Sequence, residues 1–328
     1  MNQQKNERVC WIDICKGLAI MLVILGHTYR SNGVQNWLYA FHMPIFFVLS
    51  GWIRGNKGKV NSAVFIKKQA LGLLWPYVLF EVLTYLYWIV VESHFRNFDF
   101  GPLWFLVALF FIEVICNAVI VNRSKLTTAV LVMICLLLFW LGSMYVDPTL
   151  IVAWIPRTAG GMTFYLVGLL ASKYRKIFDV QRDISKRSII ICLVVGMVLT
   201  IPLSMYNGRV DMYNLKAGNI VVYFIAALVG SAMLCSLSMF INKNKVIEFF
   251  GRYSILILCT HEPIKRAVIY VTAKITGIES EEVRNLLVGG VLITVVVLLI
   301  EVVVISIFRL IADKTKGSKI APLIEFVK

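Results

Sequence analysis

The sequence predicts an all-α integral membrane protein, a bundle of about ten transmembrane helices with both termini in the cytoplasm. Of its 328 residues, 59% are hydrophobic and 16% are charged, whereas soluble domains have about 45–50% apolar and about 25% charged residues. The mean hydropathy is +0.80. Too few polar side chains remain to cover a globular protein, so lipid must solvate much of the surface.

The apolar segments set the number of helices. A spanning helix needs about 20 largely apolar residues. The chain contains ten such segments with no soluble domain or internal repeat between them, which predicts a single transmembrane domain over residues 1–328. The predicted spans are 11–30, 37–53, 70–91, 101–121, 127–146, 151–172, 188–206, 217–241, 253–273 and 286–308.

Lysine and arginine predict the orientation. With the N-terminus inside, 23 basic residues fall in cytoplasmic segments and six in outer segments, as the positive-inside rule requires. The formal net charge of +15 would suggest nucleic acid in a soluble protein. Here the basic residues lie between apolar runs, so we expect membrane lipid as the partner and no nucleic acid. These observations predict a multi-pass protein of the cytoplasmic membrane.

The cysteines do not indicate a disulfide or a metal site. The chain has seven, most of them inside apolar runs, and no CxxC motif. Such cysteines are typical small buried residues. We therefore expect no metal cofactor.

The first predicted span carries polar residues at helical spacing. Asp13, Lys16 and His27 stand among apolar neighbours, and at about 100° per residue they share one face. His27 lies about 16 Å along the axis from Lys16. Polar residues in a membrane helix usually face a protein interior or a water-filled cavity, which favours a polar track with His27 and Asp13 as catalytic candidates. The alternative is an interfacial ion pair and a packing histidine.

The second predicted span, 37–53, contains the sequence FHMPIFFVLSGW. It places His42 at a depth comparable to that of His27, as a further catalytic candidate or merely an interfacial anchor. Pro44 opens or kinks this helix, and Gly51 permits close helix approach. In the next loop Lys67 and Lys68 precede the third span. They could bind a nucleotide phosphate or simply belong to a solvated loop.

Four further residues are candidates for substrate binding. Trp104 lies at the outer start of the fourth span, where it could also be an aromatic belt residue. Arg157 is expected to be buried and to need a carboxylate or phosphate partner. His261 and Glu262 form a polar cluster beside the helix break expected at Pro263. Three other carboxylates lie within predicted spans and could pair with Arg157: Glu81, Glu113 and Glu301.

Several linked blocks resemble one known family. WIDICKG, LGH and FHMPIFFVLSG resemble the opening of the acyltransferase 3 family, in particular its subgroup similar to fucose 4-O-acetylases. LLWPY, GPLWFLVALFF and GRYSILILCTHEPI resemble later family blocks in the same order. The resemblance runs from residue 8 to about residue 264.

This resemblance implies a roughly ten-helix membrane enzyme. Such an enzyme takes an acyl group, usually acetyl, from cytoplasmic acyl-CoA and delivers it to a hydroxyl of an extracytoplasmic or lipid-linked glycan. The essential histidine of the family matches His27, and its basic partner, often arginine, matches Lys16. The Arg-x-x-Arg motif of the family has no clean match, and Lys67 and Lys68 occupy that region.

The chemistry of acyl transfer fits the first span. Moving an acyl group from a thioester to an alcohol needs a base for the hydroxyl proton, and an imidazole suits that role. His27 could instead accept the acyl group in a covalent intermediate. An alternative class is a transporter or flippase of a polar or glycolipid substrate, to which midplane polar residues and helix-breaking prolines are also suited. The sequence identifies neither the acceptor nor the oligomeric state.

Overall fold

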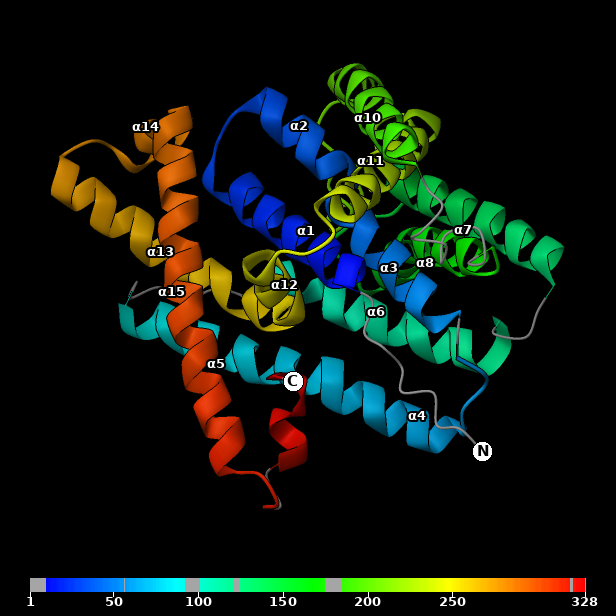
Figure 1. The fold of residues 1–328 in the computed structure, drawn as a ribbon, viewed down its shortest axis with the longest axis horizontal. Helices are drawn as coiled ribbons and strands as arrows, with labels where there is room; N and C mark the ends of the chain where they lie inside the picture. The colour runs from blue at the N-terminus through cyan, green and yellow to red at the C-terminus, as the bar shows by residue number, and fades with distance from the viewer. Residues whose placement is uncertain are drawn as a thin grey trace.

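The protein is helical throughout the part that is described. The computed structural model describes residues 10–55, 57–91, 101–120, 124–174, 185–318 and 321–327, and these ranges contain no named strand. The helices labelled in Figure 1 are α1 Cys10–Thr28, α2 Asn32–Phe41, α3 Pro44–Arg54, α4 Ser62–Gln69, α5 Trp75–Val91, α6 Trp104–Ile115, α7 Lys125–Tyr145, α8 Trp154–Ser172, α10 Lys186–Asn207, α11 Ile220–Ile241, α12 Lys245–Arg252, α13 Ser254–Thr276, α14 Ser280–Asn285 and α15 Leu287–Lys314.

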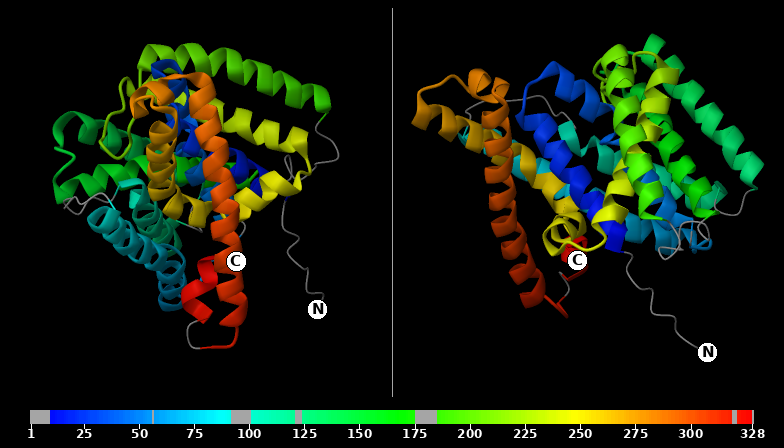
Figure 2. Two further views of the ribbon diagram at one scale, coloured as in Figure 1. Left: turned by 90° about the vertical axis from the view of Figure 1, so that its left-hand side faces the viewer. Right: turned by 45° about the horizontal axis from the view of Figure 1, so that its top comes forward.

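Helix α1 forms the centre of the bundle. It packs against α11, α12, α13 and α15, and its most apolar window is 61% buried. Helices α13 to α15 lie on one side of it and α7 with α8 on the other, as both Figure 1 and Figure 2 show. The polar residues of α1 are therefore held inside protein rather than against lipid.

The peripheral helices present apolar surface outward. The most apolar window of α10 is only 17% buried and that of α7 is 22% buried. Large side chains such as Leu126, Val198 and Leu299 are 75%, 63% and 63% exposed. Apolar surface of this extent needs lipid around it. The protein is thus a multi-pass membrane protein by the composition and packing of its helices.

Within the described residues, six helices are long and apolar enough to cross a membrane. They are Cys10–Thr28, Ser62–Val90, Lys125–Tyr145, Lys186–Asn207, Ile220–Ile241 and Leu287–Lys314. The all-helical class is confirmed, whereas the number of about ten spans stays a prediction. Helices α8 and α13 have the required length, but they carry Arg157 and a charged cluster, respectively. Residues 1–9, 92–100 and 328 lie outside the described residues, and the cytoplasmic location of both termini also stays a prediction.

The prediction of one helix over 37–53 is wrong. The segment is divided into α2, which ends at Phe41, and α3, which begins at Pro44. Proline has no N–H, and in a continuous helix its ring would clash with the carbonyl four residues earlier. Pro44 therefore starts a new helix, and His42 stands at the junction as the C-cap of α2.

Two other helices differ from the predicted boundaries. The third span begins near Ser62 rather than at residue 70, because α4 continues through a π-helical segment, Ala70–Leu74, into α5. The break expected at Pro263 does not occur, since α13 runs from Ser254 to Thr276 with this proline inside it. The short helices α12 and α14 were not predicted, because each is too short to give an apolar window.

Helices α3 and α8 approach each other at two glycines. A Cβ atom built on Gly51 would lie 1.9 Å from the carbonyl oxygen of Tyr165, and one on Gly168 would lie 2.0 Å from that of Val48. Each glycine thus faces the backbone of the other helix. Small residues allow this contact between membrane helices, as the sequence predicted for Gly51.

We expect Gly168→Ala to destabilise the protein. The new methyl group must push against the Val48 carbonyl, which is backbone and cannot swing away. Overpacking of this kind costs about 1–3 kcal/mol. The matched control is Gly72→Ala, where a Cβ meets nothing within 4 Å. Thermal unfolding in detergent compares the two variants. Equal melting temperatures for both would contradict the close approach of α3 and α8.

Candidate functional site

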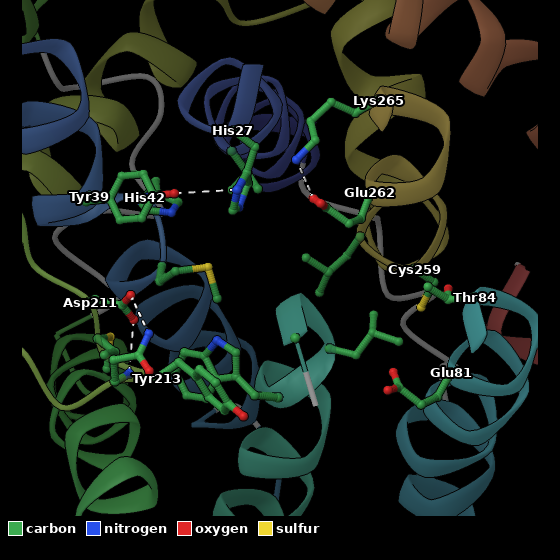
Figure 3. A pocket seen from close by; sticks show the side chains of 18 of the residues that line it. His27, Tyr39, His42, Glu81, Thr84, Asp211, Tyr213, Cys259, Glu262 and Lys265 are labelled. Carbon is green, nitrogen blue, oxygen red and sulfur yellow. Dashed lines mark hydrogen bonds and ion pairs between the residues drawn. The ribbon is translucent and has the colours of Figure 1, made fainter. Parts of the chain in front are cut away.

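A cavity of about 370 Å³ lies beside the C-terminal half of α1. We call it the central cavity. Its walls come from α1, the α2–α3 junction, α5, the start of α6, the loop 209–214 and α13. Figure 3 shows polar side chains from these elements converging on it. The residues with polar groups in its lining include His27, Tyr39, His42, Glu81, Trp104, Arg209, Asp211, Glu262, Lys265 and Arg266.

His27 occupies the last turn of α1 and is half-buried. Its Nδ1 lies 3.4 Å from the hydroxyl oxygen of Tyr39. Its ring centroid lies 5.5 Å from that of His261. The backbone oxygen of His27 accepts a hydrogen bond from Arg284 Nη2 at 2.8 Å. The imidazole is therefore oriented from two sides while it remains open to the cavity.

His42 lies at the α2–α3 junction on the same cavity. Its Nδ1 is 2.7 Å from the carbonyl oxygen of Leu38. A carbonyl oxygen only accepts, so Nδ1 carries the proton and Nε2 has the lone pair. The ring centroids of His42 and Tyr39 are 4.6 Å apart. Tyr39 thus contacts both histidines, and Figure 3 shows it beside His42 with its hydroxyl group directed at His27.

His261 lies behind His27 and does not line the cavity. It is fully buried, and its Nδ1 is 3.0 Å and 2.9 Å from the carbonyl oxygens of Ile257 and Leu258. Nδ1 therefore carries the proton. Among the described residues no group forms a hydrogen bond with Nε2. His261 and Glu262 therefore do not form one cluster at the cavity as predicted, because only Glu262 lines it.

Glu262 holds two cations on α13. Its carboxylate binds Lys265 Nζ at 2.6 Å and Arg266 Nε at 3.1 Å. The guanidinium of Arg266 also stacks on the ring of Trp88, 4.6 Å from its centroid. The Lys265 and Glu262 side chains are only 9% and 18% exposed. This ion-pair cluster forms the wall of the cavity that faces His27 (Figure 3).

Asp13 and Lys16 lie at the other end of α1. Asp13 Oδ2 is 3.6 Å from Arg252 Nε, and its backbone carbonyl abuts Gly251 of α12. Lys16 is half-buried. Asp13 and His27 are separated by about 21 Å along the helix axis, and Asp13 lines no cavity near His27. The side chains of Asp13 and His27 therefore do not meet, although the two residues share a helix.

Arg157 supports the cavity from outside. Its Nε donates to the carbonyl of Tyr213 at 2.6 Å and its Nη2 to that of Pro148 at 2.5 Å. Its guanidinium stacks on the Tyr213 ring at 4.3 Å. The described hydrogen bonds therefore go to backbone carbonyls rather than to the expected carboxylate or phosphate. Glu113 lies near Arg54, and Glu301 accepts from Thr260.

The remaining predicted residues are divided between the cavity and the surface. Trp104 is buried, lines the central cavity and packs against Tyr213 with ring centroids 6.2 Å apart. Lys67 and Lys68 are exposed on α4. Neither lysine lines the central cavity.

A second cavity of about 450 Å³ meets the first at His27. We call it the basic cavity. The two share His27, Tyr39, Arg209, Lys265 and Arg266. The basic cavity adds two further cations, Arg30 and Arg284.

The sequence did not single out Tyr39, Arg30, Arg209 or Arg284. Tyr39 could have been found, because it lies three residues before His42 and so on the same helix face. The arginines lie in or near loops far apart in the chain. They gave no local signal.

A model of the acyltransferase 3 family, described as an acyltransferase domain, matches residues 10–306. The match covers every element that contributes to the two cavities. Comparisons with curated proteins and with solved structures found no match.

Proposed function

This chain belongs to the acyltransferase 3 family, and on that premise we propose that it is a membrane O-acyltransferase. In this proposal it moves an acyl group, acetyl by preference, from acyl-CoA to a hydroxyl of an extracytoplasmic or lipid-linked glycan. Its membrane-embedded helices fit an enzyme that links a cytoplasmic donor to an acceptor on the other side.

The observation that carries the proposal is the position of His27 between two cavities. One cavity can hold the acyl thioester and the other the acceptor, with the imidazole accessible from both. A general base must lie within hydrogen-bond reach of the proton that it removes. Of the five residues that line both cavities, His27 has the imidazole, the side chain best suited to act as such a base.

The transfer step proceeds as follows in our proposal. The acceptor hydroxyl oxygen attacks the thioester carbonyl carbon while His27 takes the hydroxyl proton. The carbon–sulfur bond then breaks, and the same proton passes to the sulfur, so that free CoA thiol and an ester are formed. In this proposal Nδ1–H of His27 donates to the Tyr39 hydroxyl oxygen, which lies 3.4 Å away, so that Nε2 has the lone pair and is the basic atom. A covalent acyl-histidine is the alternative course.

Donor binding is proposed at the opposite end of α1. Lys16, Lys67 and Lys68 would hold the CoA phosphates at the cytoplasmic face. The pantetheine arm would extend along α1 toward His27, over the separation of about 16 Å between Lys16 and His27. Charge-assisted contacts of this kind are the usual means of phosphate binding.

Acetyl-CoA turnover tests the proposed function. The purified full-length protein in lipid nanodiscs should slowly hydrolyse radiolabelled acetyl-CoA, and faster with an accepted sugar. A transporter would ignore acetyl-CoA. Mass spectrometry of surface glycans from cells with and without the gene should show a difference equal to one acetyl group. Absence of both signals would overturn the assignment.

We expect Lys16→Ala to weaken acetyl-CoA binding at least about tenfold. Loss of one charge-assisted contact typically corresponds to about 1.5–3 kcal/mol. The matched control is Lys274→Ala in the last turn of α13, which should bind as the wild type does. Calorimetric titration with acetyl-CoA provides both affinities. Equal affinities for the two variants would remove Lys16 from the donor site.

A further inference from the structure

The basic cavity gathers cations from four segments of the chain. Arg30 follows α1, Arg209 lies in the loop after α10, Lys265 and Arg266 lie on α13, and Arg284 lies on α14. No carboxylate appears among the residues that line this cavity within the described part of the chain. Such a concentration of one sign of charge attracts an anion.

The carboxylates near the cavity do not balance these five cations. Glu262 is shared by Lys265 and Arg266, and Glu281 binds Arg30. Asp211 lines only the central cavity, where it accepts from Asn214. Within the described residues, the five cations therefore exceed the two paired carboxylates by three positive charges.

Two of the arginines bind only neutral groups through the contacts described. Arg284 donates to the backbone oxygens of Thr28 and His27 at 3.1 Å and 2.8 Å. Arg209 is exposed and stacks on the Tyr39 ring, 4.3 Å from its centroid. Arg209 forms no ion pair with a carboxylate of the described residues. The planar guanidinium binds phosphate and carboxylate groups in a bidentate manner.

We infer that the basic cavity binds an anionic group of the acceptor, so that the acceptor is a phosphorylated or acidic sugar rather than a neutral one. This inference rests on the proposed function. The shared chemistry is a phosphate or carboxylate held by Arg209 and its neighbours. An anion held there brings an adjacent sugar hydroxyl to His27, because the two cavities meet at that residue.

The donor does not fit this cavity. The phosphates of CoA are separated from its thioester by the whole pantetheine arm. An anion in the basic cavity, however, lies beside the imidazole, since Arg284 donates to the backbone oxygen of His27 itself. The anionic group must therefore belong to the substrate whose charge is close to its reacting atom, which is the acceptor.

Direct binding measurements test the inference without acetyl-CoA. The full-length protein in phosphatidylcholine nanodiscs is titrated with glucose 1-phosphate, glucuronic acid and glucose. We expect one or both of the anionic probes to bind, more weakly as salt increases, and glucose to bind at least about tenfold more weakly. Phosphate and carboxylate acceptors are distinguished by which probe binds. Equal binding of all three sugars would overturn the inference.

Matched variants identify the site. Arg209→Gln should weaken binding of the anionic probe about tenfold, the loss of one charge-assisted contact. Lys216→Gln should not, because this exposed lysine belongs to the same loop but lines neither cavity. Wild-type affinity in Arg209→Gln would overturn the inference.

A lipid headgroup is distinguished by changing the nanodisc. If phosphatidylglycerol in the nanodisc displaces glucose 1-phosphate, the cavity binds lipid and the acceptor assignment is wrong. If the anionic probes bind but no acceptor stimulates acetyl-CoA turnover, the anion site stands and the proposed acyl transfer fails.

Discussion

Replacing His27 by alanine should reduce acyl transfer about 10²- to 10⁴-fold, the usual contribution of a general base. The variant loses the imidazole where the two cavities meet, whereas the helix around it keeps its packing. Acetyl-CoA binding should stay near the wild-type value, because the proposed phosphate contacts lie at the other end of α1. The measurement is transfer to acceptor per folded protein.

Two comparisons separate a chemical role of His27 from a structural one. Added imidazole should restore part of the activity of His27→Ala, since it can enter the space that the side chain leaves, and should not restore a misfolded protein. His42 lines the same cavity, but the variant His42→Ala should lose less activity than His27→Ala. If His27→Ala keeps more than about a tenth of wild-type transfer, well above the activity expected without a general base, His27 is not the base and His42 becomes the candidate.

Glu262→Gln should cause the largest loss of stability among the substitutions considered. Glutamine has the same shape as glutamate but no charge. Lys265 therefore keeps its positive charge and loses the carboxylate that lies 2.6 Å from its Nζ. Removal of one member of a buried ion pair costs up to about 3–5 kcal/mol. Both side chains are mostly buried, which places this pair in that class. The measurement is the difference in the free energy of unfolding in denaturant between Glu262→Gln and the wild type.

The double variant Glu262→Gln with Lys265→Met serves as the control. It removes Lys265, the more deeply buried of the two cations that Glu262 binds, so most of the lost stability should return. Transfer activity should not return, because the wall of the cavity opposite His27 has lost the ion pair between Glu262 and Lys265. A double variant no more stable than Glu262→Gln alone would show that the ion pair does not determine the loss.

The apolar segments predicted the helical class and the long peripheral helices. Helices α7, α10 and α15 begin and end within a few residues of the predicted spans, except that α15 extends to Lys314. The boundaries failed where a local effect overrides apolar length. Pro44 divides one predicted span into two helices, and α4 continues the third span into a polar sequence.

The site was predictable in part. Polar residues within apolar runs singled out His27, His42 and Glu262, and the structure brings all three to the central cavity. Spacing along one helix could not show that the cavity lies only at the His27 end, so Asp13 was predicted as a catalytic candidate although it does not line the cavity. The arginines of the basic cavity depend on contacts between distant segments, and no local pattern contains that information.

The hydrogen bonds from Arg284 to the end of α1 have a consequence for synthesis of the protein. They join residues 256 and 257 positions apart, and Glu262 and Lys265 are almost as distant from His27 in the chain. The ribosome therefore releases α1 into the membrane long before the groups that complete the surroundings of its imidazole exist. A nascent chain that stops before α13 carries His27 without Glu262, Lys265 or Arg284. It should remain chemically inert until nearly the whole protein has been inserted.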